Sequence, residues 1–399
     1  MPHVLAHTIE IATTVLTVAG MAYYLSSLIA TWLFLRERRR PHADFAPGVS
    51  ILKSLKGLDP GMMDAFRSHC RQSYGGEYEM LFGVSSVDDP AAAAVHALQA
   101  EFPDRAIRLV MCPRQLGTNG KVSTLAQLAE VARSEFLLVN DSDITVGPHY
   151  LERTISRFAP DAQPSRKAGL PVGLVTALYR GRAHGTLASR LESLQISTEF
   201  IPSVLLSKWI EGGLHYGLGS TLAVRREALE KIGGFAALAD QLADDYELGA
   251  RMKPAGYRVE LSAEVVETSV PAYDWRGFSD HQLRWLRTVR CSRPGGYAGL
   301  VFTYGLSWAV LNVLASGLSP LSLWLLGLSF FLRLAQAMLV GAGVLFDHEV
   351  LANLWLLPFR DAVSSALWVA GFAGKTIVWR GQRFVLDGGK LLKAPDQEN

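Results

Sequence analysis

Residues 136–146 read FLLVNDSDITV, and this stretch decides the fold that we expect for the chain. Four apolar residues run directly into an amide and two carboxylates, Asp141 and Asp143, that are one residue apart. An Asx-turn at the end of a buried strand would explain such a cluster. A divalent cation would explain it too, because hard ions prefer oxygen ligands and alternate carboxylates at a strand terminus can converge on one. The surrounding sequence has to choose between these two interpretations.

From about Pro41 to Pro294, short apolar strands alternate with amphipathic helices. This alternation predicts an α/β domain with a mainly parallel sheet, in which ligands bind beyond the carboxyl ends of the strands. The expected strands are Val49–Leu52, Tyr78–Val84, Ile107–Met111, Phe136–Val139, Val172–Leu178 and Thr221–Val224. The expected helices are Met62–Ser73, Ala91–Glu101, Val122–Ala132, Gly185–Ser207 and Tyr246–Lys253.

Three acidic clusters fall at the expected ligand-binding edge of this sheet. Asp88-Asp89 ends the second predicted strand, Asp141-Ser142-Asp143 ends the fourth, and Asp244-Asp245 begins a later helix. Each has a purely structural interpretation, since Asp-Asp-Pro starts helices, Asp-Ser-Asp makes turns, and acids suit the positive end of a helix. Their joint placement on one edge favours a binding site.

Three further motifs share that region or follow it. The loop from Leu116 to Lys121 opens a helix and carries a cation, so it is either a plain turn or a cradle for an anion. The turn Gly217-Leu-Gly-Ser-Thr221 allows close backbone approach to a ligand. The segment His281-Gln-Leu-Arg-Trp285 has helical spacing and is followed by more arginines. It is either a membrane-interfacial face or a diphosphate clamp in which Arg284 binds phosphate and Trp285 contacts the substrate.

The N-terminal region predicts a membrane anchor. Residues 11–35 contain no Asp, Glu, Lys or Arg and are long enough to cross a bilayer as a helix. The basic run Arg36-Glu-Arg-Arg-Arg40 follows this segment, whereas a cleaved signal would carry its positive charge in front. Because positive flanks stay in the cytoplasm, the next part of the chain should be cytosolic.

A second apolar region lies near the C-terminus. Residues 295–332 are uncharged and are broken by Gly317-Leu-Ser-Pro320, which predicts two helices, the second running to about Phe346. A third candidate, Val350–Trp379, is interrupted by Pro358-Phe-Arg-Asp361. Three full spans here would put the basic segment Arg380-Gly-Gln-Arg383 outside, so we expect one segment to be interfacial or re-entrant. The expected domains are an anchor (1–40), a cytosolic catalytic domain (41–294), a membrane region (295–380) and a basic, polar tail (381–399).

Composition narrows the function classes. Hydrophobic residues make up 49% of the chain and charged residues 19%, which is typical of a membrane protein rather than a soluble one. The three cysteines lack CxxC spacing and support neither a disulfide framework nor a zinc site. The net charge of +2 gives no case for nucleic-acid binding.

Taken in order, these motifs resemble the membrane-bound ceramide glucosyltransferases, glycosyltransferase family 21. That family has a GT-A fold and a D, D, D, (Q/R)xxRW signature. The resemblance covers nearly the whole chain, from the N-terminal anchor and Leu52-Lys-Ser-Leu-Lys-Gly-Leu-Asp59 to the closing Thr376-Ile-Val-Trp-Arg-Gly-Gln-Arg383. The bacterial branch associated with hopanoid synthesis is most similar in Val139–Ile144, Ala243–Leu248 and His281–Trp285.

The resemblance implies a role for each motif. Asp89, with Asp88 beside it, would hold the uridine or ribose end of a UDP-sugar donor, and Asp141 and Asp143 would bind a divalent metal (Mg²⁺ or Mn²⁺) and the diphosphate. Asp245 would be the catalytic base, and Arg284 and Trp285 would belong to the last motif. The residues expected to support nucleotide binding are Lys53, Asn119, Lys121 and Asp244. His281 departs from the family pattern of Gln or Arg, and the charge of a histidine depends on pH.

The chemistry can also be argued from the residues. A nucleotide diphosphate leaves only if its developing charge is stabilised, by a divalent ion and by cations such as Arg284. An acceptor hydroxyl must lose a proton, for which Asp245 is the candidate base, and direct displacement with one base predicts inversion. The expected acceptor is a membrane lipid, such as ceramide or a hopanoid. Three alternatives remain, namely a processive polysaccharide synthase, a metal-dependent nucleotidyl or phosphoryl transferase, and a non-catalytic membrane protein.

Overall fold

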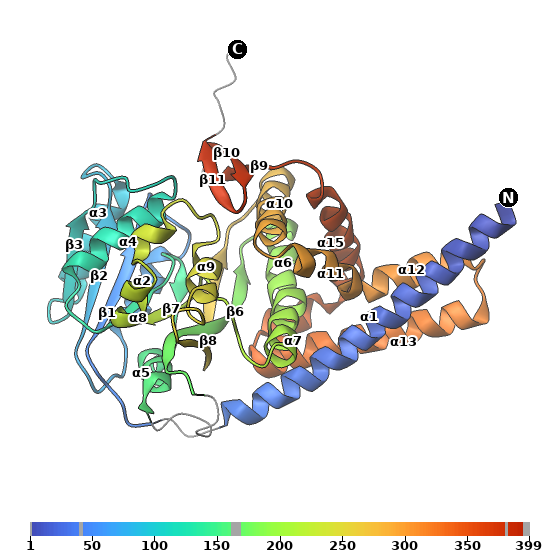
Figure 1. The fold of residues 1–399 in the computed structure, drawn as a ribbon, viewed down its shortest axis with the longest axis horizontal. Helices are drawn as coiled ribbons and strands as arrows, with labels where there is room; N and C mark the ends of the chain where they lie inside the picture. Colours follow the sequence, from blue (N-terminus) through green and yellow to red (C-terminus); the bar gives the residue numbers. More distant parts are fainter. Residues whose placement is uncertain (1, 40–42, 161–168, 380–381, 394–399) are drawn as a thin grey trace, which may run out of the picture. The chain divides into compact units, whose positions relative to one another are not determined.

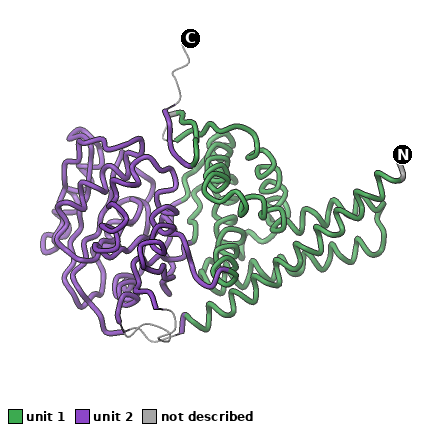
Figure 2. The backbone as a smooth tube through the Cα atoms, in the orientation of Figure 1, with its two compact units in different colours: residues 1–37, 180–210, 270–388 green, residues 38–179, 211–269, 389–399 purple. Residues whose placement is uncertain are grey.

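The computed structural model describes residues 2–39, 43–160, 169–379 and 382–393. Arg40 and Pro41, at the expected boundary of the anchor, and Arg380 and Gly381, in the expected closing motif, lie outside the described residues, as does 394–399 of the expected tail. The chain forms two compact units (Figure 2). Unit 1 contains residues 1–37, 180–210 and 270–388, and unit 2 contains residues 38–179, 211–269 and 389–399.

Most of an eight-stranded sheet lies in unit 2, with the strand order β3-β2-β1-β4-β7-β6-β8-β5 (Figure 1). The first four strands in that order are parallel, with β1 pairing both β2 and β4, and β2 pairing β3. Their carboxyl ends therefore meet at one edge. These strands are β1 (Val49–Ser54), β2 (Tyr78–Val84), β3 (Ala106–Met111) and β4 (Phe136–Val139).

The other half of the sheet is antiparallel. β7 pairs antiparallel with both β4 and β6, and β5 pairs antiparallel with β8. Because β7 runs antiparallel to β4, the start of β7 lies beside the carboxyl end of β4. The glycine-rich turn that precedes β7 therefore lies beside the Asp-Ser-Asp segment that follows β4. These strands are β5 (Ile144–Thr145), β6 (Val172–Ala183), β7 (Leu222–Arg225) and β8 (Arg258–Val270).

The helices of unit 2 begin at polar caps that the sequence supplies. The Asp89 carboxylate accepts a hydrogen bond from the N–H of Ala91, and the Asn119 side chain accepts one from Val122, so both residues cap helices. The helical elements are α2 (Met62–Cys70), α3 (Pro90–Glu101), α4 (Gly120–Val131), α5 (Tyr150–Ile155), η1 (Ser156–Phe158), α8 (Arg226–Lys231), η4 (Phe235–Leu238) and α9 (Asp244–Ala250).

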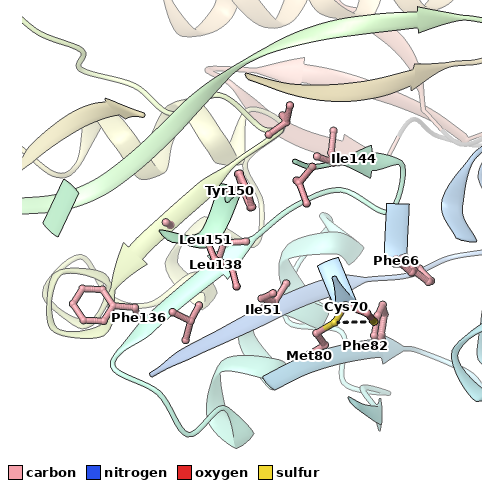
Figure 3. Packing of buried hydrophobic residues seen from close by; sticks show 14 of the residues in the cluster. Ile51, Phe66, Cys70, Met80, Phe82, Phe136, Leu138, Ile144, Tyr150 and Leu151 are labelled. Carbon is pink, nitrogen blue, oxygen red and sulfur yellow. Dashed lines mark hydrogen bonds between the residues drawn. The ribbon is translucent and has the colours of Figure 1, made fainter. Parts of the chain in front are cut away.

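The core of unit 2 is built from the apolar faces of the parallel strands and the helices that cover them (Figure 3). Phe66 and Phe82 pack with their ring centroids 4.7 Å apart, and the Cys70 thiol lies 3.7 Å from the Met80 sulfur. All four residues of β4 are fully buried. The stretch that opened the sequence analysis is therefore a core strand, and its polar end emerges at the edge of the sheet.

The structure confirms the α/β fold class, and the expected strands match observed ones within a few residues. Three expectations on the helices were wrong. The helix expected over Tyr246–Lys253 begins at Asp244 and ends at Ala250. The single helix expected over Gly185–Ser207 is α6 (Leu187–Gln195) followed by a π-helical segment, η3 (Ile196–Phe200), and α7 (Ile201–Ile210). The helix expected over Met62–Ser73 ends at Cys70. Strand β8 was not among the expected strands, although alternating polar and apolar residues such as these are a strand signal.

Unit 1 is mainly helical. Two of its helices are long and apolar enough to cross a membrane, Val4–Arg38 within α1 and Pro320–Val344. A third span is formed if the bent pair Pro294–Thr303 and Gly305–Ala315, which meet at 56°, counts as one. The expected turn at 317–320 is present, with Gly317 and Leu318 at positive φ. In the described part of the chain, residues 350–379 form no helix of spanning length, because they divide into short helices and a strand.

The other elements of unit 1 are helices and two short strands. They are α1 (Pro2–Arg38), α10 (Trp275–Ser292), α11 (Pro294–Gly299), η5 (Leu300–Thr303), α12 (Gly305–Ala315), α13 (Pro320–Ala337), η6 (Met338–Val344), α14 (His348–Asn353), η7 (Leu354–Leu356), α15 (Leu357–Gly371), β9 (Thr376–Trp379) and β10 (Gln382–Asp387). β9 and β10 pair antiparallel. The last strand, β11 (Lys390–Lys393), belongs to unit 2.

One buried ion pair in unit 1 joins Arg333 and Asp361. The Arg333 guanidinium donates to both carboxylate oxygens of Asp361, at 2.9 and 2.7 Å, and to the carbonyl of Thr198. Arg333 and Asp361 are both buried. A charge among apolar helices is tolerated when its partner supplies such hydrogen bonds, which is why Asp361 can lie in an otherwise apolar segment.

Candidate active site

Asp141 and Lys121 form the centre of the candidate site in unit 2. Asp141 follows β4, and Lys121 lies in the first turn of α4. The Lys121 ammonium nitrogen lies 2.7 Å from Oδ1 of Asp141 and 3.7 Å from Oδ2 of Asp244. One cation thus bridges two of the three acidic clusters, and Asp141, with 44% of its side chain exposed, remains open to a ligand.

The glycine-rich turn before β7 brings Asp245 to the same place. The N–H of Gly217 donates to the Asp245 carbonyl at 3.1 Å, and a Cβ on Gly217 would lie only 2.8 Å from that oxygen. A Cβ on Gly219 would lie 3.1 Å from Oδ2 of Asp245 and 3.9 Å from Oδ2 of Asp141. Glycine at both positions therefore lets the turn approach Asp245 closely, Gly217 at its main-chain carbonyl and Gly219 at its carboxylate. We call Asp141, Asp143, Asp244 and Asp245 the acid cluster.

Asp143 is held from β8. Its Oδ2 accepts hydrogen bonds from the Thr268 hydroxyl at 2.6 Å and from the Ser269 N–H at 3.1 Å. Burial, and then the neighbouring Asp141 carboxylate, raise the pKa of Asp143 to about 6. The Asp-Ser-Asp segment is therefore tied to β8, and this positions its second carboxylate.

The acid cluster carries more negative charge than its lysines neutralise. Burial, followed by repulsion from Asp244, raises the pKa of Asp245 to about 6, and burial raises the pKa of Asp244 as well. Burial opposes the charge of Lys121, but the carboxylates of Asp141 and Asp244 outweigh it and raise the pKa of this lysine. Carboxyl groups with raised pKa values at one edge of a sheet are typical of a functional site.

Lys53 approaches the cluster from β1. Its ammonium group is buried and donates to the carbonyl oxygen of Asp141 at 3.1 Å. Burial lowers the pKa of Lys53 to about 7, against the opposing effect of the Asp141 and Asp143 carboxylates. Lys53 thus contacts the backbone of the Asp-Ser-Asp segment.

Asp89 lies on the same sheet edge and binds the loop that follows β1. Its two carboxylate oxygens accept the N–H of Gly57 at 3.0 and 3.2 Å, in addition to the helix-capping bond. The next acid of that loop, Asp59, accepts a hydrogen bond from the Ser142 hydroxyl, so the loop joins Asp89 to the Asp-Ser-Asp segment. Asp88 is exposed, and its N–H bonds to the Ser86 hydroxyl.

Asn119 uses both ends of its amide within the chain. Its oxygen caps α4, and its nitrogen donates to the carbonyl of Gln241 at 2.8 Å. The adjacent Thr118 donates to Asp240 through both its N–H and its hydroxyl. The loop from Leu116 to Lys121 is thereby fastened to the segment that leads into Asp244, which brings Lys121 to the acids.

The last motif lies on α10 in unit 1 and forms a second group. Nδ1 of His281 lies 2.9 Å from Oε2 of Glu192, and the His281 ring contacts the rings of Tyr273 and Trp285, with centroid separations of 5.4 and 4.9 Å. Arg284 and Trp285 are both partly exposed on the same helix.

The carboxylates of Asp141 and Asp143 provide the hard oxygen ligands that a divalent cation needs. Among the described residues, no group of three or more His, Cys, Asp and Glu side chains is arranged to hold a metal. Mg²⁺ and similar ions accept one or two carboxylates when substrate phosphates complete the coordination, so a two-carboxylate site fits a metal that binds together with a diphosphate. The excess negative charge of the acid cluster also favours a cation there.

Sequence reasoning missed several residues of this region. Asp59 was available as a signal, since it lies in the quoted segment after the first strand. Thr268, Ser269 and Glu192 gave none, because each contacts its partner across more than 80 residues of chain and belongs to no recognisable pattern.

Comparison with known families settles the class of protein. The family model described as glycosyl transferase family 21 matches residues 12–392. The chain belongs to this family. It is therefore a glycosyltransferase, as the order of its motifs had indicated.

The family 21 chain is similar to two curated ceramide glucosyltransferases from Caenorhabditis elegans. The chain is 23% identical to ceramide glucosyltransferase 3 over 95% of its own length and 83% of the relative's length. It is 21% identical to ceramide glucosyltransferase 1 over 87% of its own length and 73% of the relative's.

Among solved structures, the family 21 chain is similar to a mannosyltransferase from Pyrobaculum calidifontis, determined in complex with GDP-Man and Mn²⁺. The match has a TM-score of 0.53 at 19% identity, and covers 92% of this chain and 97% of the other. This likeness confirms the GT-A fold.

Proposed function

We propose that this chain is a membrane-bound, inverting glycosyltransferase that moves glucose or N-acetylglucosamine from a UDP-sugar to a hydroxyl group of a lipid. The observation that carries the proposal is the meeting of Asp141, Asp244 and Asp245 around Lys121 at the carboxyl ends of the parallel strands. The names of the curated relatives support ceramide as the acceptor class, and a hopanoid is the second candidate. The expected catalytic domain comprises residues 41–294, on the cytoplasmic face of the cell membrane.

In this proposal the donor binds over the acid cluster. Asp141 and Asp143 would hold a divalent metal, Mg²⁺ or Mn²⁺, which neutralises the diphosphate when bound. The mannosyltransferase with the same fold, which holds a nucleotide sugar and Mn²⁺, supports both groups. Asp89 is assigned to the uridine or ribose end, and Lys53 and Lys121 are assigned to the nucleotide. Arg284 would stabilise the charge of the departing diphosphate.

Asp245 is the proposed general base. Burial and the neighbouring Asp244 raise its pKa to about 6, so that it is ionised at neutral pH but remains a better proton acceptor than an ordinary carboxylate. Its carboxylate lies beside Gly219, where no side chain separates it from Asp141. A hydroxyl deprotonated by Asp245 would attack the sugar carbon opposite the diphosphate and invert its configuration.

The acceptor would arrive from the bilayer. Unit 1 has two helices of spanning length, or three with the bent pair, and α10 precedes the bent pair directly in the chain. A lipid presents its polar hydroxyl at the membrane surface while its chains stay in the hydrocarbon. This favours a lipid over a soluble sugar as acceptor.

The experiment that tests the proposal incubates membranes containing the chain with labelled UDP-glucose or UDP-N-acetylglucosamine and a panel of ceramide, hopanoid and diacylglycerol, followed by mass analysis. We expect one sugar on one lipid, released UDP and a β-glycosidic product. Long polymers would indicate a processive synthase instead, and release of pyrophosphate would indicate a nucleotidyl transferase.

The base assignment is tested with Asp245→Asn. We expect turnover to fall about 10²- to 10⁴-fold, because the hydroxyl keeps its proton, while donor binding is retained. The exposed Asp64, on α2, supplies the control variant Asp64→Asn, which should keep full turnover. Normal turnover of Asp245→Asn with intact donor binding would remove this assignment.

A further inference from the structure

The buried carboxylate of Glu192 contacts the first residue of the His281–Trp285 motif. Glu192 lies on α6, and its Oε2 is 2.9 Å from Nδ1 of His281. The side chain of Glu192 is only 3% exposed, against 18% for His281. The partner that anchors the imidazole is therefore inside unit 1, and the histidine is the more exposed of the two.

The hydrogen bond fixes which ring nitrogen carries a proton. An ionised carboxylate can only accept, so Nδ1 of His281 must donate to it. The other nitrogen, Nε2, is then left for a substrate. The choice between the two ring nitrogens is made by Glu192.

Two aromatic rings contact the His281 ring. Tyr273 stacks on it at 28° with a centroid separation of 5.4 Å, and Trp285, one helical turn further along α10, lies at 4.9 Å. Rotation of the imidazole about its χ2 bond would move Nδ1 away from Glu192 and break their hydrogen bond. The ring is thus held in one plane with one tautomer.

Glu192 is itself held by a second buried chain of hydrogen bonds. The Gln282 amide donates to Glu192 Oε2 at 3.2 Å, and the Gln282 oxygen accepts a bond from Arg360 Nη2 at 2.7 Å. Arg360 is 1% exposed, and its Nε lies 3.9 Å from Oε2 of Glu199, although neither Nε nor Nη1 makes a hydrogen bond within the described residues. Glu192 is thus linked through Gln282 to a buried guanidinium, and this network restrains the carboxylate.

We infer that Glu192 is a positioning residue for glycosyl transfer, which sets the tautomer and ring orientation of His281 so that Nε2 is presented to the substrate. This inference rests on the proposed function, in which the His281–Trp285 motif contacts the donor diphosphate or the acceptor. A Gln or Arg at position 281 would be longer and would have a fixed hydrogen-bonding pattern. At His281, Glu192 supplies this fixed pattern by holding the ring. A histidine is shorter than either and needs a partner to hold its direction.

The test is a double-mutant cycle measured as turnover in membranes. Glu192→Gln should lower kcat about tenfold in the His281 background, with little change in the KM for the donor, because the bound imidazole loses its defined tautomer. In the His281→Gln background, Glu192→Gln should change kcat less than twofold, because an amide has no tautomer to set. A tenfold loss in both backgrounds would overturn the inference.

A matched control removes a buried carboxylate that serves only the fold. Asp347, 3% exposed, accepts a bond from Ser197 at 2.6 Å, and Ser197 continues the helical stretch that carries Glu192. Asp347→Asn should lower thermal stability as much as Glu192→Gln while leaving kcat unchanged. An equal loss of kcat in this control would also overturn the inference, since it would mean that any buried carboxylate of this region has the same effect.

A second variant covers the case in which Glu192→Gln does not accumulate in membranes. Glu192→Asp keeps the charge but withdraws it by one methylene, and should lower kcat only when residue 281 is histidine. Failure of the proposed function is seen separately, because the parent chain would then transfer no sugar to any lipid of the panel. If the effects of the Glu192 and His281 substitutions on kcat were additive, only the positioning role of Glu192 would be removed.

Discussion

The ammonium group of Lys121 lies 2.7 Å from the carboxylate of Asp141, although 20 residues separate them in the chain. Asp141 thereby makes an ion pair at the N-terminal turn of α4, where Asn119 and Thr118 tie the helix to the segment before Asp244. Lys121 thus offsets part of the charge of the acid cluster in the described structure.

Replacing Lys121 by methionine should leave more of the negative charge of the acid cluster without a compensating cation. We expect Lys121→Met to cost about 1 kcal/mol, allowing for solvent screening at the half-exposed Asp141, and to lower Tm by about 2–4 °C. Added Mn²⁺ should raise Tm more in this variant than in the parent, because a divalent ion replaces the lost cation. Differential scanning fluorimetry measures both effects, with Lys253→Met, at an exposed lysine, as the control. Equal metal responses would contradict this account.

The pH profile should depend on the pair Asp244 and Asp245. The pKa of Asp245 is raised to about 6, so the base is ionised above that pH and protonated below it. Turnover should therefore be full at neutral pH and fall as pH drops through about 6. In Asp244→Asn, one of the causes of the raised Asp245 pKa is gone, and the acid limb should move to lower pH.

The control for this shift is Glu247→Gln, which removes a carboxylate from the same helix, where Glu247 pairs with Arg251. Its acid limb should match that of the parent. Initial rates from pH 4.5 to 8 decide the question, and an acid limb of Asp244→Asn that stayed in place or moved upward would rule out the like-charge explanation.

The close approach of the glycine turn predicts a selective loss of activity in Gly219→Ala. The added methyl group would lie 3.1 Å from Oδ2 of Asp245, so the carboxylate must move by a few tenths of an ångström. We expect about a tenfold lower kcat with a nearly unchanged Tm, since small displacements of a catalytic group are costly to rate rather than to stability. Gly147→Ala, whose new Cβ makes only an ordinary contact at 3.7 Å, should behave as the parent. A variant of Gly219 with parental kcat would show that the base does not need its present position.

The buried ion pair of Arg333 and Asp361 predicts how single and double variants differ in stability. Arg333→Met leaves the buried Asp361 carboxylate without its bidentate partner and should cost about 3–5 kcal/mol. The double variant Arg333→Met/Asp361→Leu removes both charges and should recover most of that loss. Thermal aggregation in detergent measures the three chains, and a double variant as unstable as the single one would mean that Arg333 acts mainly through Thr198 and Gln336.

Much of the fold could be predicted because it depends on the pattern of apolar and turn residues along short segments of the chain. The strands Tyr78–Val84 and Phe136–Val139 were predicted with their observed bounds, since each is a short apolar run with turn residues at its end. The long apolar segment 11–35 predicted a helix for the same local reason. By contrast, the π-helical break at Ile196–Phe200 escaped prediction, because tertiary packing and not the local pattern decides it.

The candidate site divides in the same way. The residue types at strand ends, Asp89 and the Asp141–Asp143 pair, were visible in the sequence, and so was the glycine turn. Their partners were not. That Thr268 holds Asp143, and that Glu192 holds His281, depends on contacts across 125 and 89 residues.

The amino-acid sequence by itself determined where strands end in acids, where a helix can cross a bilayer, and which family the order of motifs indicates. Each of these depends on neighbouring residues and on the solvation of their side chains. Only the tertiary structure decided which cation neutralises which carboxylate and which pKa values rise, because burial and charge–charge distances arise when separate strands and helices meet. The chemistry of this protein depends on those distances.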